Sequence, residues 1–154
     1  MFYVKTIINN IEQNENDGSR NYEIVLKYVE ENPGKTLSQI SYNLSIPAST
    51  LNHHLRNLES NNKIIMKRTY KKRYFPINMT KNQEIKYSIQ NNNGLKEIVK
   101  IMSAQKEFSL DEIVEKSACS KSIVSKRLKI LSEFEIIKKS KINKKIVYSL
   151  DQRE

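Results

Sequence analysis

The second half of the chain repeats the first half at an offset of 73 residues, without a gap. When the two repeats are aligned at this offset, apolar residues align with apolar residues. The aligned pairs are Val25 with Ile98, Val29 with Met102, Ile40 with Ile113, Leu51 with Val124, Leu55 with Leu128, Leu58 with Leu131 and Ile64 with Ile137. A repeat of this regularity indicates one structural unit used twice. Each unit is near the lower size at which a domain buries its own core.

The first unit begins with residues that predict two helices. An apolar stripe at positions i, i+3, i+4 and i+7, typical of an amphipathic helix, is formed by Tyr22, Val25, Leu26 and Val29. We expect this helix to end at Asn32-Pro33-Gly34, because proline and glycine interrupt helical structure. Thr36 and Gln39 have the spacing of a capping box, which predicts a short second helix. Ser109 and Glu112 have the same spacing one repeat later.

A third helix is predicted after Pro47, which is acceptable at a helix start. Its apolar and polar residues fall on separate faces in both repeats. The apolar face consists of Leu51, Leu55 and Leu58 in the first repeat and of Val124, Leu128 and Leu131 in the second. The polar face consists of Ser49, Asn52, His53 and Arg56 in the first repeat and of Ser122, Ser125, Lys126 and Lys129 in the second.

Each third helix is followed by two short strand-like segments with basic residues between them. In the first repeat the predicted strands are 64–68 and 73–76, and in the second they are 136–140 and 145–150. Both pairs predict β-hairpins with tips rich in Lys and Arg. Three helices followed by a basic hairpin form a winged helix-turn-helix. The expected fold is therefore mainly α with small β-hairpin wings (α+β), as two tandem winged helix-turn-helix domains.

The repeat also predicts the domain boundaries. We expect an N-terminal extension over 1–20, a first domain over 21–79, a linker helix over 80–93 and a second domain over 94–154. Apolar residues near the N-terminus predict a short strand or helix, and 14–19 is expected to be a loose connector. The linker helix is expected to close at a polar break ending in Gly94.

The chain of 154 residues has a formal net charge of +10, and both repeats share the excess. A basic protein of this kind favours a polyanionic partner, either nucleic acid or an anionic membrane surface. No apolar run approaches the roughly 20 residues of a membrane-spanning helix. The single cysteine, Cys119, excludes an internal disulfide and is typical of a reducing cytoplasm.

One segment of the first repeat resembles a known protein family. Residues 49–59 have the pattern S-T-x-x-x-H-L-x-x-L-E, which resembles the recognition helix of ArsR/MarR-like winged-helix transcription regulators. The preceding Asn32-Pro33-Gly34 and the basic hairpin are similar to those of tandem winged-helix regulators in archaea. The resemblance covers 21–76 well and 95–150 more loosely, and it implies DNA binding. Metal-sensing members bind metal through cysteine-containing motifs, whereas this chain offers only Cys119 and two adjacent histidines.

In helix-turn-helix proteins the outer residues of the third helix meet base edges and phosphates, and wings contact the backbone. The predicted DNA-binding residues are Ser49, Thr50, Asn52, His53, Arg56, Lys67, Arg68, Lys71, Lys72, Arg73, Lys121, Ser122, Ser125, Lys126, Lys129, Lys141, Lys144 and Lys145, with Lys138 and Lys139 also on the second wing. Tyr70 at the first hairpin tip either packs on sugar or is merely exposed.

The remaining candidate residues give no reason to predict catalysis, a metal site or a cofactor. Adjacent residues on a helix point about 100° apart, so His53 and His54 are poorly placed to chelate one ion together. His54 is expected at the edge of the core. Cys119 aligns with Ile46 and is expected to be a small apolar filler, with a thiol switch as the alternative. The chain has three glycines and no phosphate-cradling loop or nucleophile motif.

Four functions follow from these observations. The favoured one is a double-stranded-DNA-binding transcription regulator, cytoplasmic and nucleoid-associated, with no membrane or small-molecule ligand. The alternatives are a nucleoid or replication-associated binder without sequence preference, a protein-interaction scaffold and an RNA-binding protein. The last lacks an aromatic stacking platform. A homodimer contact through 1–11 or 82–90 is expected, with packing inside the chain as the alternative.

Overall fold

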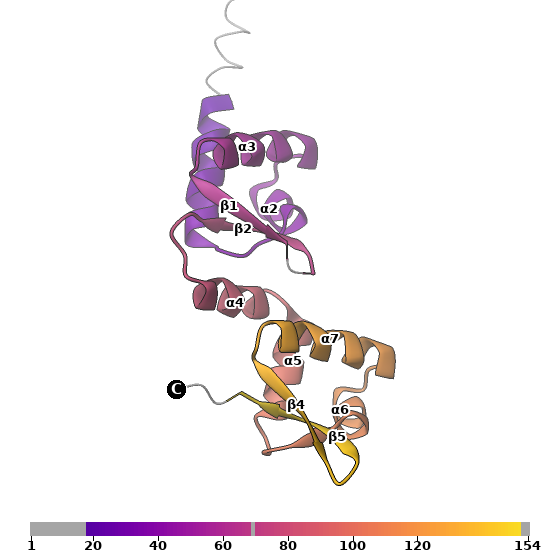
Figure 1. Cartoon of the computed structure of the whole chain (residues 1–154). Coiled ribbons are helices and arrows are strands. Elements are labelled where there is room, and N and C mark those ends of the chain that lie inside the picture. The colour runs from indigo at the N-terminus through magenta and orange to yellow at the C-terminus, as the bar shows by residue number, and fades with distance from the viewer. Residues whose placement is uncertain (1–17, 69, 152–154) are drawn as a thin grey trace, which may run out of the picture. The chain divides into compact units, whose positions relative to one another are not determined.

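The computed structural model describes residues 18–68 and 70–151, and it shows a mixed α and β fold (Figure 1). The chain divides into two compact units, here called unit 1 and unit 2. The division lies between Glu84 and Ile85, inside helix α4 (Lys81–Gln90). Among the described residues, no helix is both long enough and apolar enough to cross a bilayer.

Unit 1 consists of three helices followed by an antiparallel hairpin. Its first helix covers 18–31, and the later elements are α2 (Leu37–Leu44), α3 (Ala48–Ser60), β1 (Ile64–Arg68) and β2 (Lys72–Pro76). The register pairs Ile64 with Pro76 and Arg68 with Lys72. This order, with the hairpin directly after the third helix, is that of a winged helix.

Unit 2 has a corresponding order of elements. They are α5 (Asn93–Met102), β3 (Phe108–Ser109), α6 (Leu110–Ser117), α7 (Lys121–Glu133), β4 (Ile137–Ile142) and β5 (Lys145–Leu150). The sheet is antiparallel in the order β3-β5-β4. Helices α6 and α7 begin and end 73 residues after α2 and α3, so the offset in the sequence is also an offset in secondary structure.

Both predicted capping boxes are confirmed. The Thr36 hydroxyl accepts a hydrogen bond from the backbone N–H of Gln39, whose side chain in turn accepts from the Thr36 N–H at 2.9 Å. Ser109 and Glu112 form the same pair of bonds at the start of α6. These bonds, with the backbone bond contributing most, hold the pKa of the Glu112 carboxyl below its usual value. The two boxes therefore begin α2 and α6 in the same way.

The turns after these helices also correspond. Ser45 and Ala118, which end α2 and α6, have φ of 53° and 50°. Asn62 and Glu135, which follow α3 and α7, have φ of 53° and 59°. Left-handed backbone is uncommon outside glycine. Its recurrence at equivalent positions shows that the path from helix to helix, and from helix to hairpin, is the same in the two units.

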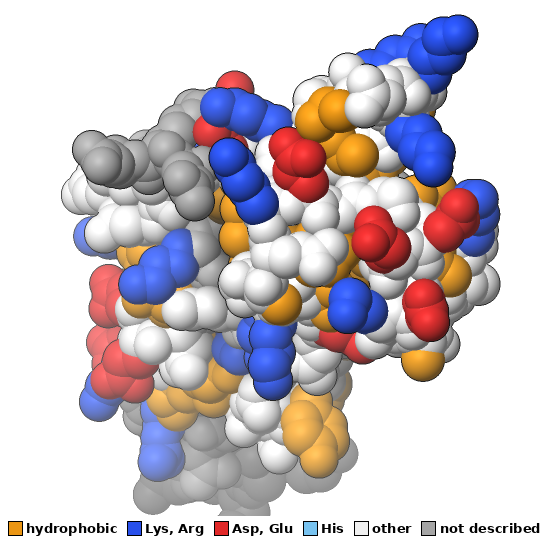
Figure 2. Space-filling model, turned by 90° about the horizontal axis from the view of Figure 1, so that it is seen from below, with side chains coloured by type: hydrophobic (Ala, Val, Ile, Leu, Met, Phe, Trp, Pro, Cys, Tyr) orange, Lys and Arg blue, Asp and Glu red, His pale blue; other side chains and the backbone are white. Residues whose placement is uncertain are grey.

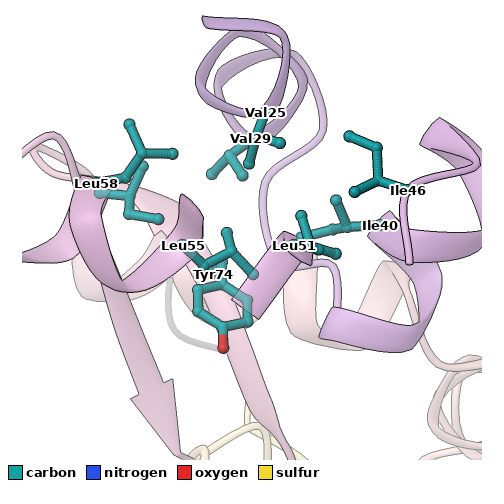
Figure 3. Close-up of a cluster of buried hydrophobic side chains, with 9 residues drawn as sticks. Val25, Val29, Ile40, Ile46, Leu51, Leu55, Leu58 and Tyr74 are labelled. Carbon is teal, nitrogen blue, oxygen red and sulfur yellow. The ribbon is translucent and has the colours of Figure 1, made fainter. Parts of the chain in front are cut away.

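The core of unit 1 joins side chains from the first helix, α2, the turn before α3, α3, β1 and β2 (Figure 3). In Figure 3 the ring of Tyr74 lies below Leu55, with its hydroxyl pointing away from the cluster. Burial raises the pKa of this hydroxyl, with Glu59 adding to the effect and Arg56 opposing it. In unit 2 the buried apolar residues include Leu95, Ile98, Met102, Phe108, Ile113, Val124, Leu128, Leu131, Phe134 and Ile137. The apolar pairs aligned by the repeat are buried in both units.

Several local expectations were wrong. Gly18 and Ser19 belong to the first helix rather than to a connector, and residues 1–17 of the expected extension over 1–20 lie outside the described residues. The expected polar break after the linker helix is present, because α4 ends at Gln90 and Asn91 and Asn92 are not helical, but Gly94 lies inside α5, where a Cβ would come within 2.6 Å of the Arg127 guanidinium. The helix instead begins at Asn92, whose side chain accepts a hydrogen bond from the Leu95 N–H at 3.0 Å. A larger side chain at position 94 would therefore displace the Arg127 guanidinium from its present place.

Two strands also extend further than expected, and one is new. β2 begins at Lys72, and β4 continues to Ile142, so that Asn143 and Lys144 alone connect β4 to β5. Both connecting residues have positive φ, 48° and 66°, which is typical of a type I′ hairpin turn. β3 was not predicted, because two residues are too few to produce an alternating pattern.

Candidate nucleic-acid interface

Helix α3 separates a buried face from an exposed face. Leu51, Leu55 and Leu58 are at most 1% exposed. The predicted contact residues Ser49, Thr50, His53 and Arg56 are exposed, and Asn52 is half-buried. Because the apolar face is held in the core, the polar face is directed outward. The polar outer surface predicted for this helix is therefore present.

The two histidines of α3 differ in environment. His53 is exposed, and its Nε2 lies 3.2 Å from Nδ2 of Asn57 one turn later. His54 is buried at the edge of the core, as expected. Burial, with a smaller contribution from His53, lowers the pKa of His54. His54 is therefore a neutral structural residue at pH 7, whereas His53 is available on the surface.

The first wing presents fewer cations than the sequence predicts. Arg68, Lys71 and Lys72 are exposed. Lys67 is half-buried, with its Nζ 3.8 Å from Oε1 of Glu84. Three basic side chains of this hairpin are thus directly available to a polyanion.

Arg73 does not belong to this surface, and its prediction as a DNA contact was wrong. It is 2% exposed. Its Nη1 donates a hydrogen bond to the carbonyl oxygen of Gly34 at 2.6 Å, and its Nη2 donates to the Tyr70 hydroxyl at 2.5 Å. The guanidinium carbon lies 5.3 Å from the Tyr70 ring centroid. Arg73 therefore connects the hairpin to the loop before α2 from inside the unit.

Helix α7 has the same division of faces as α3. Val124, Leu128 and Leu131 are buried. The predicted contacts Lys121, Ser122, Ser125, Lys126 and Lys129 are all exposed. The Nζ of Lys121 lies 3.0 Å from Oδ1 of Asp111 in α6, so part of its charge is already compensated. The remaining four residues form a polar and basic outer face.

The second wing is exposed along most of its length. Lys138, Lys139, Lys141, Lys144 and Lys145 are all exposed. Lys138 pairs with Oδ1 of Asp151 at 2.6 Å.

On the face of the molecule seen in Figure 2, Lys and Arg side chains alternate with acidic and uncharged ones. The basic charge is therefore distributed over local groups on this face.

Cys119 is half-buried instead of a closed core filler. Its Sγ accepts a hydrogen bond from Nη1 of Arg127 at 3.4 Å, and the same nitrogen lies 3.1 Å from Oε2 of Glu97. The guanidinium covers Gly94, where no side chain intervenes. The thiol is thus one part of a polar cluster beside the start of α7.

The sequence prediction missed three exposed features of the surface. Tyr42 on α2 is 86% exposed, and Ile142 and Ile146 near the tip of the second wing are 41% and 46% exposed. No other apolar residue of α2 lies three or four positions from Tyr42. This isolation from the apolar stripe could have marked Tyr42 as an outer residue. Both isoleucines lie among lysines, and Ile146 was predicted only as part of a strand and Ile142 only as part of the hairpin tip.

A protein-family model matches part of unit 1. Residues 24–62 match the family model described as "Bacterial regulatory protein, arsR family". A search of curated proteins finds no match. The solved structures that resemble the chain include the "Reduced form of the transcriptional regulator YodB from B. subtilis". It is 22% identical, the match covers 48% of this chain and 76% of that chain, and the TM-score is 0.43. Over residues 24–62, which include α2 and α3, the chain is thus similar to the helix-turn-helix of arsR-family regulators.

Proposed function

We propose that the protein is a double-stranded-DNA-binding transcription regulator. In this proposal both units are winged helices, α3 and α7 are the recognition helices, and the two hairpins are basic wings. One observation supports it above the others. In each unit a 13-residue helix buries its apolar face and exposes a polar face, and a hairpin with exposed lysines follows it.

The dimensions and chemistry of these elements fit duplex DNA. The major groove is about 12 Å wide and admits one α-helix. Small polar side chains on such a helix hydrogen-bond to base edges, and cations on the helix and wing neutralise phosphates. We assign base contacts to Ser49, Asn52, Ser122 and Ser125. Phosphate contacts are assigned to Arg56, Lys129 and the exposed wing residues.

The family match supports the same assignment for unit 1, because residues 24–62 include α3 and its entire outer face. A DNA-binding regulator acts where the DNA is, so we infer a cytoplasmic protein associated with the nucleoid. A homodimer is part of the proposal, since helix-turn-helix regulators commonly bind two half-sites. Light scattering on the full chain measures this assembly directly.

A second candidate function is DNA binding without sequence preference. The exposed lysines of the second wing favour it, because cations on a hairpin contact phosphates of any sequence. The Ser, Thr and Asn side chains on α3 favour the regulator. The two functions differ in one measurable quantity, the ratio of affinities for selected and random duplexes.

Substitution of the exposed basic residues of unit 1 tests the assigned surface. In the full chain, Arg56→Ala with Lys71→Ala and Lys72→Ala should weaken duplex binding and reduce its salt dependence, because phosphate contacts are lost. Lys27→Ala with Lys96→Ala and Lys100→Ala is the matched control, since it removes three exposed cations from helices outside the surface. Equal binding by both triple variants would contradict the assignment. Circular dichroism verifies that each variant is folded.

A further inference from the structure

The outer faces of α3 and α7 differ in chemistry although their backbones correspond. At equivalent positions Thr50, Asn52, His53 and Arg56 of α3 are replaced in α7 by Ile123, Ser125, Lys126 and Lys129. The α3 set consists mostly of side chains that both donate and accept hydrogen bonds. The α7 set has one serine, two lysines, which are donors only, and one isoleucine, whose side chain forms no hydrogen bonds.

This difference determines what each helix can distinguish. An asparagine side chain makes two directed hydrogen bonds to adenine, and serine or threonine bonds to several base edges. A lysine is a mobile point charge that binds any phosphate. Ile123 is 45% exposed and thus occupies part of the outer face of α7. The α3 face is thus suited to base recognition, whereas the α7 face is suited mainly to charge.

The helices that precede α3 and α7 also differ in charge. α2 has no charged residue over Leu37–Leu44. α6 has three exposed carboxylates, Asp111, Glu112 and Glu115, against one exposed lysine, Lys116, and Asp111 is paired with Lys121 of α7. Carboxylates on the first helix of a helix-turn-helix repel the phosphates that this helix crosses. The excess of carboxylates on α6 therefore weakens the docking of α6 and α7 on a duplex relative to that of α2 and α3, so that base contacts from α7 are secondary to those from α3.

The second wing has the opposite character. Among the described residues, Lys139, Lys141, Lys144 and Lys145 are exposed and form no ion pair. The hairpin that presents them has six residues in each strand, compared with five in unit 1. β3 pairs with β5, and this pairing attaches the hairpin to the body of unit 2. These four lysines are thus presented on a firmly attached hairpin.

We infer that the two units have different tasks. α3 of unit 1 determines which sequence is bound, and the second wing supplies affinity for the phosphate backbone that is independent of sequence. This division of tasks rests on the proposed function, since it concerns how the chain binds DNA. It predicts that specificity and salt dependence are lost through substitutions in different units.

The test compares two full-length variants on two duplexes, one selected by the wild-type protein from a random pool and one scrambled. The reading variant is Ser49→Ala with Asn52→Ala, and the wing variant is Lys144→Gln with Lys145→Gln. Lys96→Gln with Lys100→Gln on α5 is the charge-matched control. All six side chains are exposed or half-buried, so the fold should be retained. Anisotropy is recorded at several salt concentrations.

The expected results are separate for each variant. The reading variant should lower the ratio of selected to scrambled affinity by at least about fivefold and leave the salt slope unchanged. The wing variant should weaken binding of both duplexes by on the order of tenfold and reduce the slope by up to about 2, with the ratio unchanged. The control should behave as the wild type.

Other results would overturn the inference. If the wing variant lowers the affinity ratio, or leaves both affinities unchanged, the second wing does not have the assigned task. If the reading variant weakens both duplexes equally, α3 does not determine sequence preference. If the wild-type protein still discriminates between the two duplexes in either of these cases, the proposed function stands and only the division of tasks is lost. A wild-type protein that binds both duplexes equally loses the regulator function and the division of tasks together.

Discussion

The guanidinium of Arg73 donates a 2.6 Å hydrogen bond to the carbonyl oxygen of Gly34, which lies 39 residues earlier in the chain. This contact connects β2 to the loop between the first helix and α2. The backbone reinforces it, because the Gly34 N–H donates to the Tyr74 carbonyl at 2.8 Å and the Tyr74 N–H donates to the Lys35 carbonyl at 3.1 Å. The first wing is thus held to its unit by a buried arginine in addition to the β-ladder.

Arg73→Ala is expected to destabilise unit 1 by about 2–4 kcal/mol, because it leaves buried polar partners unsatisfied and opens a cavity. Arg68→Ala, five residues earlier on the exposed part of the same hairpin, should change the free energy of unfolding by less than about 0.5 kcal/mol. Urea unfolding followed by circular dichroism measures both. If Arg73→Ala leaves stability unchanged and weakens DNA binding instead, the buried arginine is not the structural connection described above.

The two capping boxes should contribute equally to their units. Thr36→Ala and Ser109→Ala each remove an N-cap hydroxyl and should each lower the free energy of unfolding by about 1 kcal/mol. Ser38→Ala is the control, because Ser38 is an exposed residue within the first turn of α2 and caps nothing. Thermal unfolding of the three variants compares them. A loss from Ser38→Ala as large as that from the cap variants would contradict the role of the caps.

Protonation of His54 should make unit 1 less stable in mild acid. Its pKa is lowered in the folded protein, first by burial and then by His53, from an ordinary value of 6.5. The unfolded chain therefore binds the proton more readily. Stability is complete above pH 6.5 and is lost as the pH falls toward the folded-state pKa, by about 1.4 kcal/mol for each unit of pKa difference.

The measurement is the urea midpoint between pH 7.5 and pH 5 for the wild type and for His54→Gln. The glutamine variant should show a weaker dependence on pH in this range, because its buried side chain does not titrate. His53→Ala is the second comparison and should retain most of the dependence, since burial is the larger cause. Identical pH profiles for the wild type and His54→Gln would show that another group is responsible.

Local patterns and the repeat explain why much of the fold could be predicted. The apolar stripes, the capping pairs at Thr36 and Ser109, and the placement of helices α3 and α7 depend on residues within one or two turns. Because each pattern recurs 73 residues later, the prediction from one repeat supports the prediction from the other. His54 at the edge of the core was likewise predictable, because its neighbours Leu51, Leu55 and Leu58 define the buried face.

The errors arise from contacts distant in sequence. An arginine beside lysines in a predicted wing has the pattern of a phosphate contact, and only the approach of Gly34 makes Arg73 internal. Gly94 suggested a helix break because its partner, Arg127, is on another helix. The charge of Lys67 and Lys121 is compensated by Glu84 and Asp111, which no local pattern connects to them. Candidate binding residues were thus predicted by type, but their availability was not.

The central claim, that the protein is a sequence-reading DNA-binding regulator, is tested most directly by duplex selection followed by affinity measurement. The full chain selects duplexes from a random pool, and fluorescence anisotropy then compares selected duplex, scrambled duplex and single strand at several salt concentrations. We predict a common sequence in the selected pool and an affinity for it at least about 10³-fold above that for the scrambled duplex. Equal affinity for both duplexes with a steep salt slope, or no binding at low salt, would contradict the claim.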